Sequence, residues 1–529
     1  MNRKLLLLVA CAWIPAVSQA QSEFRWEQFS KRIEGSQKVS PVQMDAFGEA
    51  IRLSNGALSF SATDASLPGN DALPVAVSRS YEVASRKIAS NLMFGDWDIE
   101  LPNLSGTFAT NWVVDHTSPT TRCSNVGGGP PTALASSIGG DLSVADFWRG
   151  VSISVPGVAG GELLMTDPGT TKPTDGPVYK WVTADGMVHL SCLATIKNGT
   201  GEGFLAIDKS GTRYWFDWMA QYPEPNLKTT VNIYPNLPTA YPLRKNVLYA
   251  TRVEDRFGNY VTYTYTNASN APGKLTQIAS SDGRQLTLAY TGTRVTSVTD
   301  GTRTWSYAYG TTPKGRSTLT QVTLPDGSRW TMGFSQFADA EIQFSEVYPP
   351  GEILRSCTVN QLPDNLGTEP AGTITHPAGA TATYTVFPLE HGRSNVPLSC
   401  ANVTTTPAGS APGTNNNVND DVPIIPSAAY SYTLKSKGVT GPGMVTSAWN
   451  YAYAPNTSYY RHSGVTLKYP VCTLPYPQCV NPVCTSDSCA GSSVTTVTGP
   501  GGQWERHTYG NSYRYNEGKL LKVERGYGA

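Results

Sequence analysis

A repeated Asp-Gly turn between Leu248 and Phe334 constrains the fold of this chain more than any other feature of its sequence. Four segments there follow one plan: a short strand-like lead, a turn built on aspartate and glycine, and a run of alternating apolar and polar residues. The turns are Asp255-Arg256-Phe257-Gly258, Asp282-Gly283, Asp300-Gly301 and Asp326-Gly327. Such self-similarity predicts a stack of equivalent β-hairpins.

The residues after each turn alternate with the period of a β-strand. Counting from the turn glycine, the third, fifth and seventh residues are apolar or aromatic, and the third unit is shifted by one residue. These positions hold Val261, Tyr263 and Tyr265; Leu286, Leu288 and Tyr290; Trp305, Tyr307 and Tyr309; and Trp330, Met332 and Phe334. A period of two places them on one face of each strand, so we expect that face to be buried.

The turns and the lead strands also predict local geometry. Asp-Gly is a strong cue for a tight two-residue hairpin turn, because glycine adopts a positive φ at little cost. In the lead strands, Leu275 and Ile278 are three residues apart, as are Val295 and Val298. This spacing breaks strict alternation and predicts a β-bulge or a sheet edge.

Weaker copies of the unit lie outside this block. We expect one hairpin between Asp208 and Asp217, and further ones after Gly379 and around Gly502. The segment Gly518 to Val523 is typical of a lead strand without its turn, so the chain is expected to end inside a repeat.

Composition favours a β-rich fold. Only 15% of residues are charged, whereas 50 glycines, 38 prolines and 27 tyrosines favour strands and turns, so we expect very little α-helix. The 40 basic and 40 acidic residues balance, which excludes nucleic-acid binding driven mainly by charge.

Residues 1–20 have the features of a secretory signal peptide. Asn2-Arg3-Lys4 is basic, Leu5 to Val17 is mostly apolar, and Ser18-Gln19-Ala20 is a small-residue cleavage site. A competing interpretation takes Leu8-Val9-Ala10-Cys11 as a lipoprotein box with a lipidated Cys11, but the apolar run before that cysteine is short for a signal. No later stretch has the length of a membrane span. We expect an exported protein that is secreted, periplasmic or on the cell surface.

Removal of the signal leaves eight cysteines, an even number that favours disulfides in an oxidising compartment. They are Cys123, Cys192, Cys357, Cys400, Cys472, Cys479, Cys484 and Cys489. The cluster from Cys472 to Cys489 has neither a Cys-x-x-Cys pair nor a histidine, so it does not favour zinc. The sequence leaves the disulfide pairing open.

A second set of motifs precedes the repeats. It consists of Asn55-Gly56-Ala57-Leu58-Ser59-Phe60, Leu67-Pro68-Gly69-Asn70, Leu73-Pro74-Val75-Ala76-Val77-Ser78-Arg79-Ser80-Tyr81 and Phe94-Gly95-Asp96-Trp97 with Leu101-Pro102. In this order, the motifs and the turn-and-aromatic units resemble the leading segment and YD repeats of the bacterial Rhs family. The matching stretches cover roughly a third of the chain.

The resemblance implies an all-β fold in which an antiparallel YD-repeat β-sheet coils into a hollow shell, or part of one, after a β-rich N-terminal domain. In the family, such shells enclose a carboxy-terminal toxic domain or serve as cell-surface modules. This sequence lacks the Asp-Pro-x-Gly stretch that closes the shell and releases the passenger in toxin-bearing members. The partners implied are an encapsulated polypeptide or a downstream toxin chain.

These patterns divide the chain into six regions. We expect a signal peptide at 1–20, an Rhs-like β-rich region at 21–247, tandem YD repeats at 248–335, a degenerate repeat region at 336–400, a loop or linker at 401–422, and a cysteine-containing region at 423–529 that ends inside a repeat.

No constellation of catalytic residues stands out. The sequence has no Gly-x-Ser-x-Gly elbow, His-Glu-x-x-His helix or phosphate loop. In Asp115-His116 and Glu390-His391 an acid adjoins a histidine, but neighbours on a strand point to opposite faces. Asp96 and Asp98 cannot be placed from sequence at the separation that glycosidases need. We therefore predict no catalytic, cofactor-binding or metal-binding residue.

The aromatic residues leave one binding hypothesis open. The repeat aromatics share one parity with Leu, Val and Met, which favours packing inside the sheet. Trp215, Trp218, Tyr222 and Tyr234 follow no such parity and are the candidate ligand-contact residues, with plugging of a shell as the competing interpretation. The predicted function is an exported scaffold or shell in toxin delivery or cell-surface interaction. The alternatives are an adhesin of the cell envelope that binds a cell-surface glycan, and a hydrolase on a β scaffold.

Overall fold

A computed structural model describes residues 43–44, 46–70, 73–83, 92–108, 120–124, 150–174, 176–228, 240–342, 366–392, 400–405, 418–423, 428–454, 491–512 and 516–528. The predicted signal peptide, Cys11, Asp115, His116 and Tyr234 lie outside these residues. The described chain is nearly all β, with antiparallel strands throughout, as the sequence predicted. The helical elements within it are the short helix α3 (Ser335–Asp339) and the 3-10 turn η1 (Pro500–Gly502).

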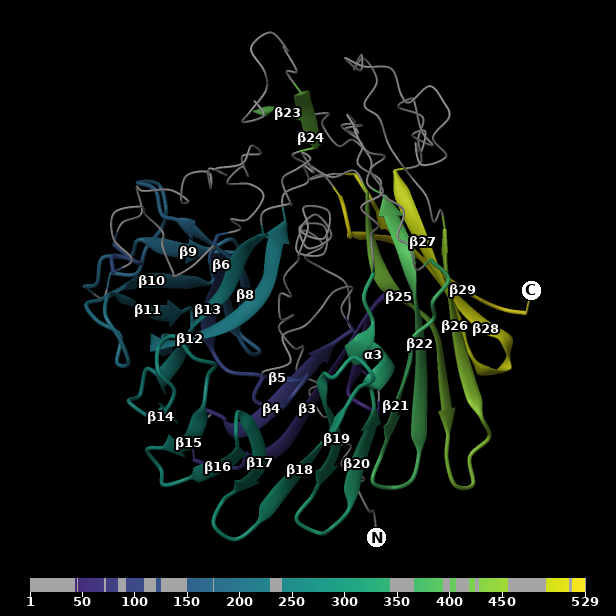
Figure 1. The fold of residues 1–529 in the computed structure, drawn as a ribbon, viewed down its shortest axis with the longest axis horizontal. Coiled ribbons are helices and arrows are strands. Elements are labelled where there is room, and N and C mark those ends of the chain that lie inside the picture. The colour runs from purple at the N-terminus through teal and green to yellow at the C-terminus, as the bar shows by residue number, and fades with distance from the viewer. Residues whose placement is uncertain are drawn as a thin grey trace, which may run out of the picture.

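The first strands form a five-stranded sheet, hereafter the inner sheet. Its strands are β1 (Gln43–Met44), β2 (Glu49–Arg52), β3 (Ala57–Leu67), β4 (Val75–Glu82) and β5 (Asp98–Ile99), paired in that order. In β4 each alternate residue is buried, as expected of a strand with one face against a core. Figure 1 shows β3 and β4 in purple, crossing the middle of the molecule.

The next eight strands close into a ring. They are β6 (Asn103–Phe108), β7 (Ser152–Val155), β8 (Ala159–Met165), β9 (Trp181–Thr183), β10 (Val188–Leu193), β11 (Gly203–Asp208), β12 (Arg213–Lys228) and β13 (Ala240–Glu254). Each pairs with the next, and residues 244–249 of β13 pair back with β6. Residues 252–254 of β13 pair instead with β14, so the sheet branches at β13.

From this branch a long antiparallel sheet, hereafter the wall, continues strand by strand. It contains β14 (Tyr260–Tyr265), β15 (Leu275–Ser280), β16 (Gln285–Thr291), β17 (Arg294–Thr299), β18 (Thr304–Thr311), β19 (Ser317–Thr323), β20 (Arg329–Gly333), β21 (Ala371–Thr375), β22 (Thr381–Gly392), β25 (Ala428–Thr440), β26 (Ser447–Ala454), β27 (Ser492–Thr498), β28 (Gln503–Gly510) and β29 (Leu520–Tyr527). In Figure 1 the wall curves from the ring below the inner sheet to the opposite side of the molecule.

The repeated turns join hairpins, as predicted, but most have longer loops than expected. Gly283 donates its N–H to the Ser280 carbonyl at 3.1 Å, and Ser280 donates to the Arg284 carbonyl at 2.9 Å, which leaves a three-residue loop. The units at Gly258 and Gly327 make the same pair of bonds. The two-residue expectation is wrong for the Asp-Gly turns at Gly283 and Gly327, because a positive-φ glycine at the end of a three-residue loop also joins twisted strands. The first unit, whose turn has a different sequence and for which a longer loop was expected, has the same three-residue loop.

The third unit explains its own one-residue shift. There Asp300 donates its N–H to the Arg303 carbonyl at 3.3 Å, so that only Gly301 and Thr302 lie between the bonded residues. This loop is the two-residue turn that the sequence predicted. Its glycine is the first loop residue rather than the last, so the aromatic positions counted from the glycine come one residue later.

The lead strands contain the predicted β-bulges. In β15, Gln277 pairs with Thr264 and Leu275 with Tyr265, so Thr276 is the extra residue. The same register shift leaves an extra residue at Thr251, Thr296, Thr320, Lys435 and Leu521. In β13, β15, β17, β19 and β25 the bulge lets two buried residues three positions apart, such as Leu275 and Ile278, face the core.

The segment predicted as a loop or linker contains paired strands. The backbones of β23 (Cys400–Thr405) and β24 (Val418–Pro423) form a separate antiparallel pair. The assignment of 401–422 as a loop or linker between regions stays a prediction.

Candidate functional site

The aromatic face of the wall packs against the inner sheet. The ring of Phe334, at the end of β20, lies 4.8 Å from Phe60 and 5.1 Å from Tyr81, and it stacks on Trp97 at 5.9 Å. Tyr384 of β22 meets Phe60 edge-on at 5.1 Å. The hollow interior that the resemblance implied is therefore filled by the inner sheet at this part of the wall.

The bulges of the wall direct backbone donors toward the segments before β6. A bulge removes one residue from the ladder, so the N–H beside it becomes free for another acceptor. These bonds run from Val295 to the Met93 carbonyl, from Leu434 to the Gly56 carbonyl, from Ala250 to the Pro102 carbonyl and from Leu319 to Asp96 Oδ1, all at 2.8–2.9 Å. The irregular spacing of the lead strands thus serves to attach the leading motifs to the wall.

The carbonyls beside the bulges accept bonds from tyrosines of the following strands. The tyrosine at the last aromatic position of a unit reaches across to the preceding bulge. These pairs are Tyr265 with Ala250 at 3.0 Å, Tyr290 with Leu275 at 2.6 Å, Tyr309 with Val295 at 2.6 Å and Tyr453 with Leu434 at 2.8 Å. These buried or partly buried rings therefore contribute a polar bond as well as apolar surface.

Asp96 joins the leading motifs to the fourth lead strand. Its Oδ1 accepts the N–H of Leu319 at 2.8 Å, and its Oδ2 accepts the hydroxyl of Thr318 at 2.7 Å. Burial raises the pKa of this carboxyl from 3.8 to about 6, although both hydrogen bonds oppose the shift. Both carboxylate oxygens of Asp96 are therefore bound to the wall.

Two buried ion pairs lie at this interface. Lys437 Nζ of the wall lies 2.6 Å from Glu49 Oε1 of the inner sheet, and both side chains are almost fully buried. Within the inner sheet, Arg79 binds Asp64 at 2.8 Å and lies over the ring of Trp97 at 4.2 Å. A buried charge without its partner strongly destabilises a fold, so the Lys437–Glu49 pair couples the two sheets.

A turn of the wall holds the second leading motif. Arg284 donates from Nη1 to the carbonyls of Leu67 and Leu73, each at 3.2 Å, and from Nε to Asp282 Oδ1 at 2.8 Å. Asp282 Oδ2 accepts the N–H of Asn70 at 3.2 Å. The side chains of the repeated turn thus bind a segment more than 200 residues earlier in the chain.

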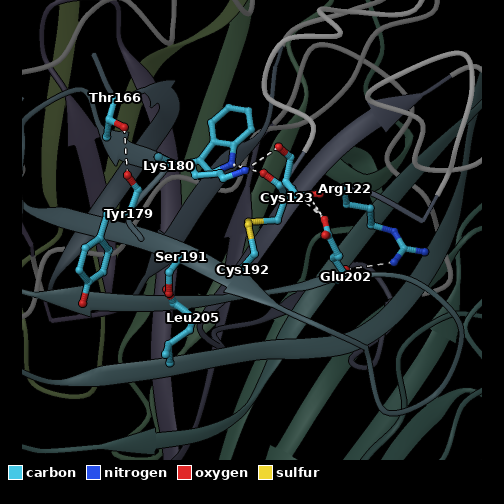
Figure 2. Close-up of a disulfide and its surroundings, with 11 residues drawn as sticks. Arg122, Cys123, Thr166, Tyr179, Lys180, Ser191, Cys192, Glu202 and Leu205 are labelled. Atoms are coloured by element: carbon cyan, nitrogen blue, oxygen red, sulfur yellow. Dashed lines mark hydrogen bonds between the residues drawn. A yellow bond between two sulfur atoms is a disulfide. The ribbon is translucent and has the colours of Figure 1, made fainter. Parts of the chain in front are cut away.

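A disulfide between Cys123 and Cys192 lies at the edge of the ring (Figure 2). It ties the short segment 120–124 to β10. Glu202 Oε2 accepts the N–H groups of Cys123 and Ser124 at 3.0 and 2.7 Å, and Trp181 Nε1 donates to the Cys123 carbonyl at 3.1 Å. Arg122 and Lys180 add bonds to the carbonyls of Thr200, Glu202 and Ser124.

This bridge confirms the disulfide prediction for one pair of cysteines. Cys357, Cys472, Cys479, Cys484 and Cys489 lie outside the described residues, and of Cys400 only the backbone is described. For these six the disulfide expectation stays a prediction.

The candidate ligand-contact aromatics have different environments. Trp215 is partly exposed, and Arg252 lies over its ring at 5.7 Å and over the ring of Tyr260 at 3.8 Å. Trp218 stacks on Tyr265 at 5.6 Å. Both tryptophans are partly exposed, and Trp215 lies in a cluster with Arg252 and Tyr260.

The binding hypothesis required Tyr222 to lie at the surface, but its side chain is buried. It is 3% exposed, and its hydroxyl lies 2.9 Å from that of Tyr249 and accepts the N–H of Gly273. Residues 218–222 of β12 pair continuously with β13, after two register shifts between Trp215 and Trp218 that change the alternation of the strand.

The adjacent Glu390 and His391 have separate partners. Glu390 pairs across the strands with Tyr430, and burial raises the pKa of its carboxyl from 4.5 to about 7. The ring of His391 lies 3.0 Å from the Thr433 hydroxyl, and burial lowers its pKa from 6.5 to about 4. The structure therefore does not assemble these neighbours into an acid–base pair.

Sequence reasoning missed the side chains that bind the two sheets together. From sequence, Asp96 stood out only as a motif residue and as one of two carboxylates two residues apart. Lys437, Glu49 and Arg284 carried no signal of a functional role. The only cue was position, since Asp96 lies inside a leading motif and Arg284 directly follows a repeated turn.

In the part of the chain that the structure describes, no group of three or more His, Cys, Asp or Glu side chains could hold a metal ion. No helix there has both the length and the hydropathy of a membrane-spanning segment. Fold and interface together define an all-β wall attached by its inner face to a smaller sheet.

No protein-family model matches the chain, and no curated protein matches it. It is similar to a chain in the crystal structure of TcdB2-TccC3, with 10% identity and a TM-score of 0.29 over 93% of this chain and 28% of that chain. The Photorhabdus luminescens Tc holotoxin pore gives 10% identity and a TM-score of 0.31 over 93% and 27%. The N-terminal domain of the effector protein SpvB from Salmonella typhimurium has 11% identity and a TM-score of 0.19, over 74% of this chain and 94% of that chain. The chain spans less than a third of the Tc toxin chains that it matches.

Proposed function

We propose that this protein is an exported YD-repeat scaffold whose wall forms part of a toxin-delivery or cell-surface interaction system, without catalysis of its own. The proposed partner is a polypeptide that the wall encloses, or a toxin chain encoded downstream. Export is supported by the signal-like residues 1–20 and by the Cys123–Cys192 bridge, since disulfides persist in oxidising compartments.

One observation carries the proposal: the charged side chains of Asp96, Lys437 and Arg284 each bind a group on the other side of the interface. Asp96 accepts two bonds from the wall, Lys437 pairs with Glu49, and Arg284 donates to the carbonyls of Leu67 and Leu73, in the second and third leading motifs. Such groups stabilise a fixed surface. This is the arrangement that a passive wall needs.

The test is protection of a partner polypeptide. The mature chain is co-expressed with the polypeptide encoded directly downstream, and the purified complex is treated with proteinase K. We expect the partner to co-purify and to be cleaved more slowly than when it is alone. Equal cleavage rates with and without this protein would contradict the wall function.

A matched pair of variants connects protection to the interface. Lys437→Glu places a second buried anion beside Glu49 and is expected to abolish protection. Lys435→Glu changes a surface lysine two residues away, which pairs with a half-exposed Glu369, and should leave protection unchanged. Reproducible turnover by the purified protein in a broad hydrolase screen would contradict the non-catalytic part of the proposal.

One observation favours a second candidate, the binding of a cell-surface glycan. Trp215 and Tyr260 share the guanidinium of Arg252 and remain partly open to solvent. Aromatic rings of this kind stack on sugars. Saturable binding on a glycan array that is lost in Trp215→Ala would support this function, and an array without binding would refute it.

A further inference from the structure

The outer edge of β29 carries exposed apolar residues that are buried elsewhere in the wall. Strand β29 pairs with β28 on one side, and no described strand pairs with its other side. It has the bulge of a lead strand, with Leu521 as the extra residue, so that Leu520 and Val523 correspond to Leu275 and Ile278 of β15.

Exposure differs sharply between these equivalent positions. Leu520 is 40% exposed and Val523 is 38% exposed. The residues at the same two positions of three earlier lead strands are all 0% exposed: Leu275 and Ile278, Val295 and Val298, and Leu319 and Val322. Apolar residues that are buried in three copies of a motif and open in another indicate a missing neighbour.

The earlier units show what that neighbour supplies. In each of them the following strand places an apolar residue opposite the second lead position: Leu286 opposite Ile278, Trp305 opposite Val298 and Trp330 opposite Val322. Four residues later, Tyr290 or Tyr309 donates its hydroxyl to the carbonyl beside a bulge. The equivalent acceptor at the edge of β29 is the carbonyl of Leu520.

The backbone of β29 also presents donors to that edge. Gly528 donates its N–H to the Gly502 carbonyl of the adjoining loop, so the residues of the other parity turn their N–H groups away from β28. These are Val523, Arg525 and Tyr527. An edge with backbone donors and an exposed apolar row is a template for strand addition.

We propose that β29 binds, as an added antiparallel strand, an extended segment of a separate polypeptide that carries apolar or aromatic residues at its first and third positions and tyrosine at its fifth. Continuity with the wall supports this occupant, because the lead strands β15 and β17 are covered by strands of this pattern and β19 by one with phenylalanine at the fifth position. The competing interpretation is that Lys522, Glu524 and Arg525 protect the edge from any partner. The inference goes beyond the proposed function, since it does not depend on what the wall encloses.

The experiment uses the mature full-length chain and a fluorescent synthetic peptide with the sequence of residues 300–311, the turn and strand of the third unit. Fluorescence anisotropy is expected to show saturable binding. Arg525→Pro removes an edge N–H that β28 does not use, and it should weaken binding about tenfold or more. Arg525→Ala loses the same side chain but keeps the N–H, and it should bind like the unmodified chain.

Two further arms make the outcome decisive. Val523→Lys should weaken binding by a similar factor, and a peptide with serine in place of Trp305 and Tyr307 should not bind. Unchanged circular dichroism and melting temperature show that Arg525→Pro still folds. The proposal is overturned if the unmodified chain does not bind the peptide, if Arg525→Pro binds it equally, or if a dimer covers the edge and the peptide does not dissociate it. Protease protection of the downstream polypeptide is a separate readout, so either proposal can fail alone.

Discussion

At the residue scale, burial gives Asp96 a measurable influence on stability. Its pKa in the folded protein is about 6 against an ordinary 3.8, so the folded state holds more protons than the unfolded state between these values. Stability therefore falls as the pH rises through this range, by about 3 kcal/mol in total. Below about pH 4 this loss of stability is absent, and above about pH 6 it is complete.

We predict that Asp96→Asn flattens this pH dependence. An asparagine can accept the Leu319 N–H through its oxygen and donate its amide to the Thr318 hydroxyl, so both contacts survive. Urea unfolding at pH 4 to 7 measures the slope for both proteins. A variant with the slope of the unmodified chain would show that Asp96 is not the group responsible.

The tyrosine bonds to the bulges are also testable one residue at a time. We expect Tyr290→Phe to lower the free energy of unfolding by about 1 to 2 kcal/mol, because the Leu275 carbonyl loses its donor at 2.6 Å. The matched control is Tyr527→Phe, on a ring that is 80% exposed. Equal unfolding curves for the two variants would contradict a structural role of this hydroxyl.

At the scale of elements, the inner sheet and the wall depend on each other through Lys437 and Glu49. Lys437→Met is expected to destabilise the protein by about 3 to 5 kcal/mol, because it leaves a buried carboxylate without its cation. Adding Glu49→Gln should restore most of the loss, and Lys435→Met at the surface should cost less than about 1 kcal/mol. Denaturant unfolding of the unmodified chain, Lys437→Met, Glu49→Gln and the double variant completes the cycle, with Lys435→Met as the surface control. A double variant no more stable than Lys437→Met would exclude the coupling.

At the scale of the whole molecule, the disulfide should stabilise the ring more than the wall. Replacing Cys123 and Cys192 together by alanine opens a cross-link that spans 69 residues, with an expected loss of about 4 kcal/mol. Hydrogen exchange should show lost protection in residues 120–124 and β10, and little change in β16 to β19. Uniform loss across both regions would mean that ring and wall unfold as one unit.

Several features could be predicted from sequence because they depend on neighbouring residues. Alternation after each turn glycine identified the buried face, and the three-residue spacing of Leu275 and Ile278 identified a bulge. The turn length was harder to predict. Gly283 and Gly301 each follow an aspartate, yet only Gly301 lies in a two-residue loop. The register of the flanking strands decides the loop length.

The candidate site was less predictable, since its contacts join distant residues. Nothing local in the sequence indicates that Lys437 meets Glu49, or that the Tyr222 hydroxyl lies in the core beside that of Tyr249. The branch of β13 between β6 and β14 depends likewise on segments far apart in the chain.

The sequence by itself thus determined the all-β class, the hairpin units and their apolar face, because a strand's two-residue period and glycine's freedom at positive φ are properties of short segments. Only the tertiary structure decided what covers that face and which charges pair beneath it. Burial of a shared surface is a property of the folded whole, and residues nearly 400 positions apart, such as Asn55 and Thr433, come into contact only there.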